Sequence, residues 1–315
     1  MMANSPRIGI IAEYNPFHNG HIYQLEWIRQ RWPNCQIVVI LSGNYVQRGE
    51  LAVADFATRK QTCIAHGVHE VYELPFWYAT QAAHIFAAGA VALAVKVHVD
   101  FLVFGAETND IDRFYDLARA IYHDEARYYE QLRTELKQGV SFPRAHQLVL
   151  EALVGQSCVL PNDILGLEYV KAIVKHQYPI TAVALQRTVS FTGVDSKRQI
   201  ASATHIRELI FAGDLAYQRY TPMVFNARPA RIEDYYPQFQ RIITTTPVAK
   251  LRQIHLVSEG MEFLFQKHIH LPSYEAFVAA CTSKRYPASR IKRVLLYILL
   301  GIETVASVPR SLEKC

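Results

Sequence analysis

Short apolar runs alternate with helix-like apolar spacing through the first half of the chain. Strands are expected at residues 7–12, 35–41, 70–74, 101–105 and 181–185. Apolar residues at helical spacing predict intervening helices at 20–31, 55–66 and 82–97, and further helices through 111–177 with breaks at Gly139, Pro143 and Pro161. Strands that alternate with crossover helices form a parallel sheet with helices on its faces. The pattern therefore predicts an α/β domain with at least four strands.

The pattern changes in the last third of the chain. A loop is expected at 187–199 and a helix at 204–212, and beyond Pro222 the spacing is mostly helical, most clearly at 248–264 and 289–301. Residues 221–315 contain 13 Lys and Arg against 7 Asp and Glu, whereas the remainder contains 20 against 21. A positive excess favours a polyanionic partner, although a solvated surface explains it equally well. We expect a catalytic domain at 1–220 and a basic helical region at 221–315.

Composition indicates a globular protein of the cytoplasm. Half of the residues are hydrophobic and 19% are charged, which excludes a largely disordered chain. The apolar stretch near the N-terminus is too short for a signal peptide, and no run reaches the roughly 20 apolar residues that span a bilayer. The five cysteines are scattered without metal-ligand spacing, so we expect inert thiols and neither a zinc site nor a disulfide framework.

The first candidate site is the sequence His18-Asn19-Gly20-His21, which follows the first predicted strand and opens a helix. Ligands of open α/β sheets bind at the carboxyl ends of the strands, and the free N–H groups of a helix start favour phosphate. Gly20 lets the backbone approach a ligand closely. Two imidazoles there would hydrogen-bond an α-phosphate during in-line attack, as catalytic residues that act by position and charge. In the alternative interpretation, His18 only caps the loop and His21 only packs.

A second element supports nucleotide chemistry. The stretch Ile200 to Arg207 opens a helix after a strand and a loop. Ser202 or Thr204 is suited to cap that helix, and Arg207, one turn further, is suited to pair with β- and γ-phosphates. Taken alone, the stretch is an ordinary helix start, so its meaning depends on the two histidines.

Taken together, these motifs resemble a known family. HNGH followed by a Ser/Thr-x-x-Ile-Arg helix start is similar to the HxGH nucleotidyltransferase superfamily. Longer strings resemble the tRNA(Met) cytidine acetate ligase family, in chain order EYNPFHNGH, SGNYVQRGE, ELPFWYATQAA, FGAE, LPNDILGLEYVKA, IASATHIR, VSEGME and SKRYPASRIKR. The resemblance extends from Gly9 to about Gly301. It implies a Rossmann-like HxGH nucleotidyltransferase domain with a parallel sheet, followed by a mostly helical C-terminal region.

The resemblance also implies an activity and its site. Family members activate acetate with ATP and pass the acetyl group to N4 of the wobble cytidine of elongator tRNA(Met). The implied ATP-binding residues are Ile11, Ala12, Glu13, Tyr14, Asn15, Pro16, Phe17, His18, Asn19, Gly20, His21, Gln24, Gly105, Asn162 and Arg187. Without the resemblance, Gly105 is an ordinary strand-end turn, Asn162 a helix-entry cap and Arg187 a surface residue.

The tRNA would bind a basic patch near the end of the chain. We expect this patch to contain Lys284, Arg285, Arg290 and Arg293, with Tyr286 and Tyr297 nearby for stacking or packing. Arg290 and Arg293 share a helix face in the predicted helix, which Lys292 does not fully join. Such a face would bind RNA phosphates. A solvated helix face is the alternative interpretation.

Differences from the family pattern keep other functions open. The segment 190–199 lacks the Tyr-His-Asp that is expected after Arg187, Phe56 stands where a lysine usually follows the aspartate, and family members usually continue further. A small-molecule adenylyltransferase and a non-catalytic nucleotide- or RNA-binding paralogue are therefore the alternatives. The polar stretch Gln47 to Glu50 is expected to form either the acceptor side of the site or a solvated turn.

Magnesium is expected to accompany ATP, because the phosphate charges need neutralisation. Glu13, Asp55 and Glu107 are the candidate ligands, and no dedicated carboxylate cage is visible in the sequence. The acetate pocket and the oligomeric state leave no pattern that can be read from the sequence.

Overall fold

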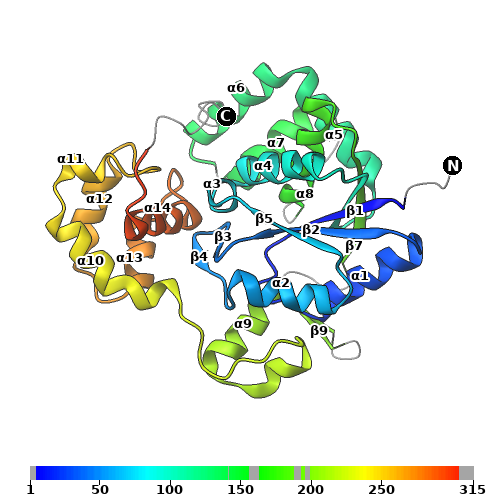
Figure 1. The fold of residues 1–315 in the computed structure, drawn as a ribbon. Helices are drawn as coiled ribbons and strands as arrows, with labels where there is room; N and C mark the ends of the chain where they lie inside the picture. The colour runs from blue at the N-terminus through cyan, green and yellow to red at the C-terminus, as the bar shows by residue number, and fades with distance from the viewer. Residues whose placement is uncertain (1–4, 141, 156–162, 188–192, 196–198, 305–315) are drawn as a thin grey trace.

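A five-stranded parallel sheet forms the centre of the protein. The computed structural model describes residues 5–140, 142–155, 163–187, 193–195 and 199–304. The strands lie in the order β5-β2-β1-β6-β7, and every adjacent pair is parallel. They are β1 (Arg7–Ala12), β2 (Gln36–Ser42), β5 (Glu70–Leu74), β6 (Phe101–Ala106) and β7 (Thr181–Gln186). All the expected strands are confirmed, and the order brings β1 and β6 to the middle (Figure 1).

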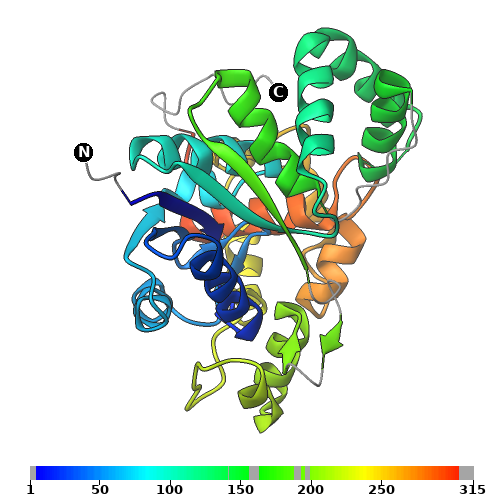
Figure 2. The same ribbon diagram turned by 90° about the vertical axis from the view of Figure 1, so that its right-hand side faces the viewer.

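Helices cover both faces of this sheet (Figures 1 and 2). Successive side chains of a strand point to opposite faces: Val38 and Ile40 of β2 pack in one core cluster, and Val39 packs in the other. Both faces are therefore apolar, as expected for a parallel sheet. The helices are α1 (Asn19–Arg31), α2 (Phe56–Ala65), α3 (Phe76–Ala79), α4 (Ala83–Lys96), α5 (Ile111–His123), α6 (Glu125–Lys137), α7 (Phe142–Val154) and α8 (Ile164–His176).

The rest of the chain is mostly helical, as expected. A short antiparallel pair, β8 (Val194–Asp195) and β9 (Ile200–Ala201), precedes α9. The region beyond α9 has an apolar core of its own, built around Phe239, Phe265 and Phe277. The boundary near residue 220 stays a prediction. The remaining elements are α9 (Ala203–Ala212), η1 (Leu215–Arg219), η2 (Ile232–Tyr235), α10 (Tyr236–Thr245), α11 (Val248–Leu251), α12 (Met261–His268), α13 (Tyr274–Cys281) and α14 (Ala288–Leu300).

One expected helical segment, 248–264, is wrong as a single helix. Helix α11 ends at Leu251 and α12 begins only at Met261. Between them the chain turns back on the end of α14, where the backbone N–H of His255 donates to the carbonyl of Ile302 at 2.8 Å. Gly260 has φ +83°, which suits glycine and interrupts a helix. Apolar spacing alone could not reveal these contacts.

The polar stretch Gln47 to Glu50 forms the turn and the start of the second strand of a β-hairpin, with Arg48 exposed in the turn. Its strands β3 (Tyr45–Val46) and β4 (Glu50–Leu51) pair antiparallel. Gly49 has φ +78° and lies against helix α14, where an added Cβ would come within 2.6 Å of the backbone nitrogen of Arg293. Lys292 forms an ion pair with Glu50 at 2.6 Å. The hairpin therefore joins the two parts of the protein.

The thiols of the described cysteines are inert. Cys35, Cys63 and Cys281 are free and buried. Burial raises the pKa of Cys63 to about 11 and that of Cys281 to about 12, so both are protonated at neutral pH. Cys158 and Cys315 lie outside the described residues.

Among the described residues, no helix combines the length and the apolar character that crossing a bilayer requires.

Candidate active site

The candidate residues meet at the carboxyl ends of the two central strands. The chain leaves β1 toward β2 on one side, and it leaves β6 toward β7 on the other. Such a reversal of strand order opens a crevice at which ligands bind. Residues 13–21 follow β1. Gly105 in β6 lies beside Arg187, because a Cβ added at Gly105 would be 3.4 Å from Nε of Arg187. Gln24, in α1, donates from Nε2 to the carbonyl of Val103 in β6 at 3.4 Å.

The two histidines cap helix α1 together. The backbone N–H of Gly20 donates to Nδ1 of His18 at 3.1 Å, and the backbone N–H of His18 donates to Nδ1 of His21 at 3.1 Å. Each Nδ1 is an acceptor, so in the neutral imidazoles the proton is on Nε2. The rings stack with centroids 3.7 Å apart. The capping role is therefore real, but it leaves both Nε2–H groups as donors for a ligand.

The surroundings hold both imidazoles neutral. Withdrawal from water lowers the pKa of His18 to about 3, with further lowering by the charges of Arg207 and Arg187. The pKa of His21 lies well below its usual value, first because of desolvation and then because of His18 and Arg187. The site therefore combines neutral donors with two nearby guanidinium groups, which suits a polyanionic ligand.

Gly20 and two aromatic rings fix the positions of the imidazoles. A Cβ on Gly20 would lie 2.9 Å from Cε1 of His18, so only glycine lets that ring fold over the helix start. The ring of His21 packs against Tyr14 and Phe17, at centroid distances of 4.6 and 5.6 Å. The spacing of the HNGH sequence is thus a packing requirement as well as a chemical one.

The start of helix α9 lies beside this loop. Ser202 is the N-cap, because its hydroxyl accepts from the backbone N–H of His205 at 3.2 Å. Arg207 donates to the carbonyl of Asn15 at 2.8 Å and to the hydroxyl of Thr204 at 3.2 Å. The structure therefore brings the two sequence motifs together.

Two residues that sequence reasoning overlooked support the strand ends. Arg59 in α2 is fully buried, and its guanidinium donates to the carbonyls of Glu13, Ser42, Gly43 and Ala54. Burial lowers its pKa to about 10. Its only sequence signal is a charged residue within a predicted amphipathic helix.

The second overlooked residue is Asp163. Its carboxylate accepts from the backbone N–H of Glu107 at 2.9 Å, just beyond β6. Its side chain is buried, and burial raises its pKa. The negative charges of Asp163 and Glu107 partly offset the lowering of the pKa of Arg187 by burial. The predicted ligand Asn162 lies outside the described residues.

The candidate magnesium ligands are not gathered into a cage. The carboxylate of Glu13 accepts from the backbone N–H of Gln47 at 2.8 Å, and Asp55 caps helix α2 through the N–H of Thr58. Within the described ranges, no group of three or more His, Cys, Asp or Glu side chains is arranged to hold a metal ion.

The basic patch is not the single exposed face that was expected. Arg293 is only 9% exposed and points to the carbonyl of Gln47, at 3.5 Å. Arg285 and Arg290 reach the carboxylate of Glu259 instead, at 3.1 and 3.5 Å. Helical spacing predicted that Arg290 and Arg293 share one exposed face, but the β3–β4 hairpin packs on helix α14 and covers Arg293. Lys284 remains exposed, and Tyr297 is buried.

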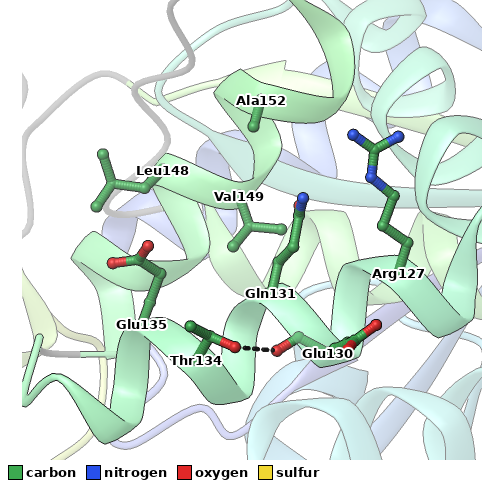
Figure 3. Close-up of a pocket in the computed structure, with 8 residues that line it drawn as sticks. All are labelled: Arg127, Glu130, Gln131, Thr134, Glu135, Leu148, Val149 and Ala152. Carbon is green, nitrogen blue, oxygen red and sulfur yellow. Dashed lines mark hydrogen bonds between the residues drawn. The ribbon is translucent and has the colours of Figure 1, made fainter.

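A separate pocket of 460 Å³ lies between α6 and α7 (Figure 3). It is lined by Arg127, Glu130, Gln131, Thr134, Glu135, Leu148, Val149 and Ala152. The hydroxyl of Thr134 donates to the carbonyl of Glu130 in its wall at 3.0 Å. None of the candidate residues lines this pocket, so it is not part of the site.

The histidines predict a pH dependence of stability. Burial lowers the pKa of His18 to about 3 in the folded protein, against an ordinary histidine value of 6.5. The unfolded chain therefore takes up a proton between these values while the folded chain does not, so the free energy of unfolding should fall as the pH drops below 6.5. One such histidine contributes a slope of at most about 1.4 kcal/mol per pH unit. Urea unfolding from pH 4 to 8 should show a smaller slope for His18→Asn, which keeps a cap acceptor; equal slopes would contradict the assignment.

The chain is similar to known proteins over most of its length. A family model described as HIGH Nucleotidyl Transferase matches residues 6–312. The tRNA(Met) cytidine acetate ligase of Mycoplasma mobile is 50% identical over 297 residues, which is 94% of this chain and 99% of that protein. The protein of the same name from Geobacillus sp. is 35% identical over 93% of this chain and 77% of its own length. The crystal structure of Thermotoga maritima TmcAL bound with alpha-thio ATP has a TM-score of 0.81 and 31% identity, covering 95% of this chain and 76% of that one.

Proposed function

This chain belongs to the tRNA(Met) cytidine acetate ligase family, and on that premise we propose that it activates acetate with ATP and acetylates N4 of the wobble cytidine of elongator tRNA(Met). One observation carries the proposal: two neutral imidazoles present Nε2–H donors at the end of β1, beside Arg187 and Arg207. The alpha-thio ATP bound to the similar Thermotoga protein supports ATP as the nucleotide.

The first step is adenylation of acetate. A carboxylate oxygen of acetate attacks the α-phosphorus of ATP, the bond to the bridging oxygen of the β-phosphate breaks, and pyrophosphate leaves. Charge builds on the α-phosphate oxygens during attack, and preorganised donors stabilise it most at that point. His18 and His21 supply those donors without gaining or losing a proton.

The second step is acyl transfer. The N4 amine of cytidine attacks the acetyl carbonyl of acetyl-adenylate, the bond from that carbonyl to the phosphate oxygen breaks, AMP leaves, and the proton lost from N4 passes to water. No covalent intermediate on a side chain is required. Catalysis therefore depends on holding the adenylate and the base in register.

The nucleotide would lie along residues 11–21 and Gln24, with Gly105, Asn162, Arg187, Ser202, Thr204 and Arg207 completing the site. The geometry of the described members supports this assignment, because Arg207 is tied to Asn15 and Gly105 is beside Arg187. Magnesium would enter on the ATP phosphates, since the described carboxylates form no cage for it.

The tRNA would contact the helical region, 221–315, while 1–220 would carry the chemistry. Lys284, Arg285 and Arg290 are the exposed or half-exposed cations suited to RNA phosphates. Arg293 is withdrawn from this set because it is buried against the hairpin.

The alternatives lose part of their support. The small-molecule adenylyltransferase was kept as an alternative because family members usually continue further along the chain. However, this chain matches two relatives named tRNA(Met) cytidine acetate ligase over 99% of their own length. The altered segment 190–199 lies largely outside the described residues and favours no alternative by its geometry.

The test is an assay with ATP, labelled acetate and elongator methionine tRNA. Label should appear on N4 of the wobble cytidine, and its appearance should require all three components. Pyrophosphate formation that follows another small acceptor, with unlabelled tRNA, would favour the small-molecule enzyme. Binding of ATP without pyrophosphate formation would favour the non-catalytic paralogue.

A further inference from the structure

The β3–β4 hairpin is tied to the loop that carries the candidate histidines. The backbone N–H of Gln47 donates to the carboxylate of Glu13 at 2.8 Å. Two residues beyond β4, the backbone N–H of Val53 donates to the side-chain oxygen of Asn15 at 2.8 Å. Both sides of the hairpin are thus bonded to the segment between β1 and His18. Arg48 follows Gln47 and therefore lies in the hairpin turn, next to the residue that bonds to Glu13.

Helix α14 holds the hairpin from the other side. The backbone of Gly49 lies against the backbone of Arg293, with no room for a Cβ. Lys292 pairs with Glu50 at 2.6 Å, and Gln47 donates from Nε2 to the carbonyl of Gln81 at 2.7 Å. A turn that is anchored at several points holds its tip residue with little freedom. Arg48 is therefore presented by a rigid support, although it lies in a loop.

The charge of Arg48 acts on the same groups as the rest of the site. Burial raises the pKa of Glu13, and the charge of Arg48 partly offsets this rise. Burial lowers the pKa of Arg207, and the charge of Arg48 adds to this lowering. Arg207 in turn acts on His18. Arg48 is exposed, and no described residue forms a hydrogen bond or ion pair with its guanidinium. Arg207 and the hairpin are both bonded to Asn15, so Arg207 and the turn that carries Arg48 lie at the same loop.

The cations at this loop suit a polyphosphate. Resting on the proposed function, we infer that Arg48 is a further catalytic residue, whose guanidinium binds the β- and γ-phosphates of ATP and the pyrophosphate that leaves. With the α-phosphate at His18 and His21, the β- and γ-phosphates would extend toward Arg207 and the hairpin turn that carries Arg48. A guanidinium fork suits two phosphate oxygens at once. The adenylation and acyl-transfer steps described above assign no role to Arg48.

Equilibrium binding of ATP and of AMP tests this role. Arg48→Ala should weaken ATP binding about 10- to 100-fold, the range for losing a hydrogen bond to a charged group. It should leave AMP binding unchanged, because AMP lacks the β- and γ-phosphates. Arg48→Lys should recover part of the ATP affinity through its charge. Arg241→Ala, at an exposed position of α10, is the matched control and should leave both affinities unchanged.

The outcomes separate the possible errors. Equal losses for ATP and AMP, or no loss for ATP, would overturn the role of Arg48. If ATP binding is unchanged and tRNA binding weakens instead, Arg48 contacts an RNA phosphate. Failure of the unaltered protein to bind ATP would count against the proposed function itself. Because Arg48 is exposed, the unfolding midpoint of Arg48→Ala should match that of the unaltered protein, which excludes a loss through misfolding.

Discussion

Replacement of His21 by alanine is expected to lower the turnover of acetate-dependent pyrophosphate formation by about 100- to 1000-fold, the usual cost of removing one preorganised donor from a developing anion. Its Nε2–H is fixed as a donor because Nδ1 accepts from the backbone of His18. The donor acts on charge that builds in the transition state, so ATP affinity should change far less than turnover. Steady-state rates and equilibrium ATP binding measure the two effects separately. His18→Ala should behave in the same way.

A control is needed because His21 also caps helix α1. Loss of a cap costs about 1 kcal/mol of stability, which would lower the amount of folded protein in a marginal variant. His21→Gln retains an acceptor for the backbone N–H of His18, since glutamine serves at this position of a capping box. It should fold like the unaltered protein, and its turnover should lie between those of His21→Ala and the unaltered protein, because its amide N–H is a neutral donor at a shifted position. Near-normal turnover in His21→Ala would contradict the catalytic role.

Replacement of Arg59 by methionine is expected to lower the free energy of unfolding by about 3–5 kcal/mol or more. The guanidinium is fully buried and donates to the carbonyls of Glu13, Ser42, Gly43 and Ala54. Methionine fills similar volume but leaves those acceptors without donors, and each unsatisfied buried group costs about 1–3 kcal/mol. Urea unfolding at pH 7 measures the change. Activity should fall as well, because two of these carbonyls follow β1 and β2.

The matched control for this change is Gln61→Met on the same helix. Gln61 is exposed, so its replacement should alter stability by no more than about 0.5 kcal/mol. Arg59→Lys should lie between the two, because an ammonium group supplies fewer donors in a less favourable geometry. If Arg59→Met is no more destabilising than Gln61→Met, Arg59 does not brace the strand ends.

Sequence patterns predicted most of the elements of the α/β part. Its strands are buried on both faces, so they stand out as continuous apolar runs, as in β2. The patterns were less informative where a distant segment decides the backbone. Residues 252–260 turn because they bond to the end of α14, and residues 45–51 form a hairpin that packs on the same helix.

The residues of the candidate site also fall into those that a local pattern predicts and those that only tertiary contacts reveal. The histidine pair and Arg207 were recognisable because they sit in short motifs at a strand end and a helix start. Arg59 and Asp163 were overlooked, since their roles come from burial and from contacts with other elements. Arg293 was placed on an exposed face because helical spacing does not reveal what covers a helix.

By itself, the sequence determined the parallel sheet, the place of HNGH between a strand end and a helix start, and the family resemblance, because periodicity and short motifs depend on residues close together in the chain. The tertiary structure alone showed that the charges of Arg187 and Arg207 act on His18, because both arginines come from distant elements. It also showed that the turn that carries Arg48 packs on helix α14 through Gly49. Long-range packing and burial set these positions, and neither leaves a local pattern.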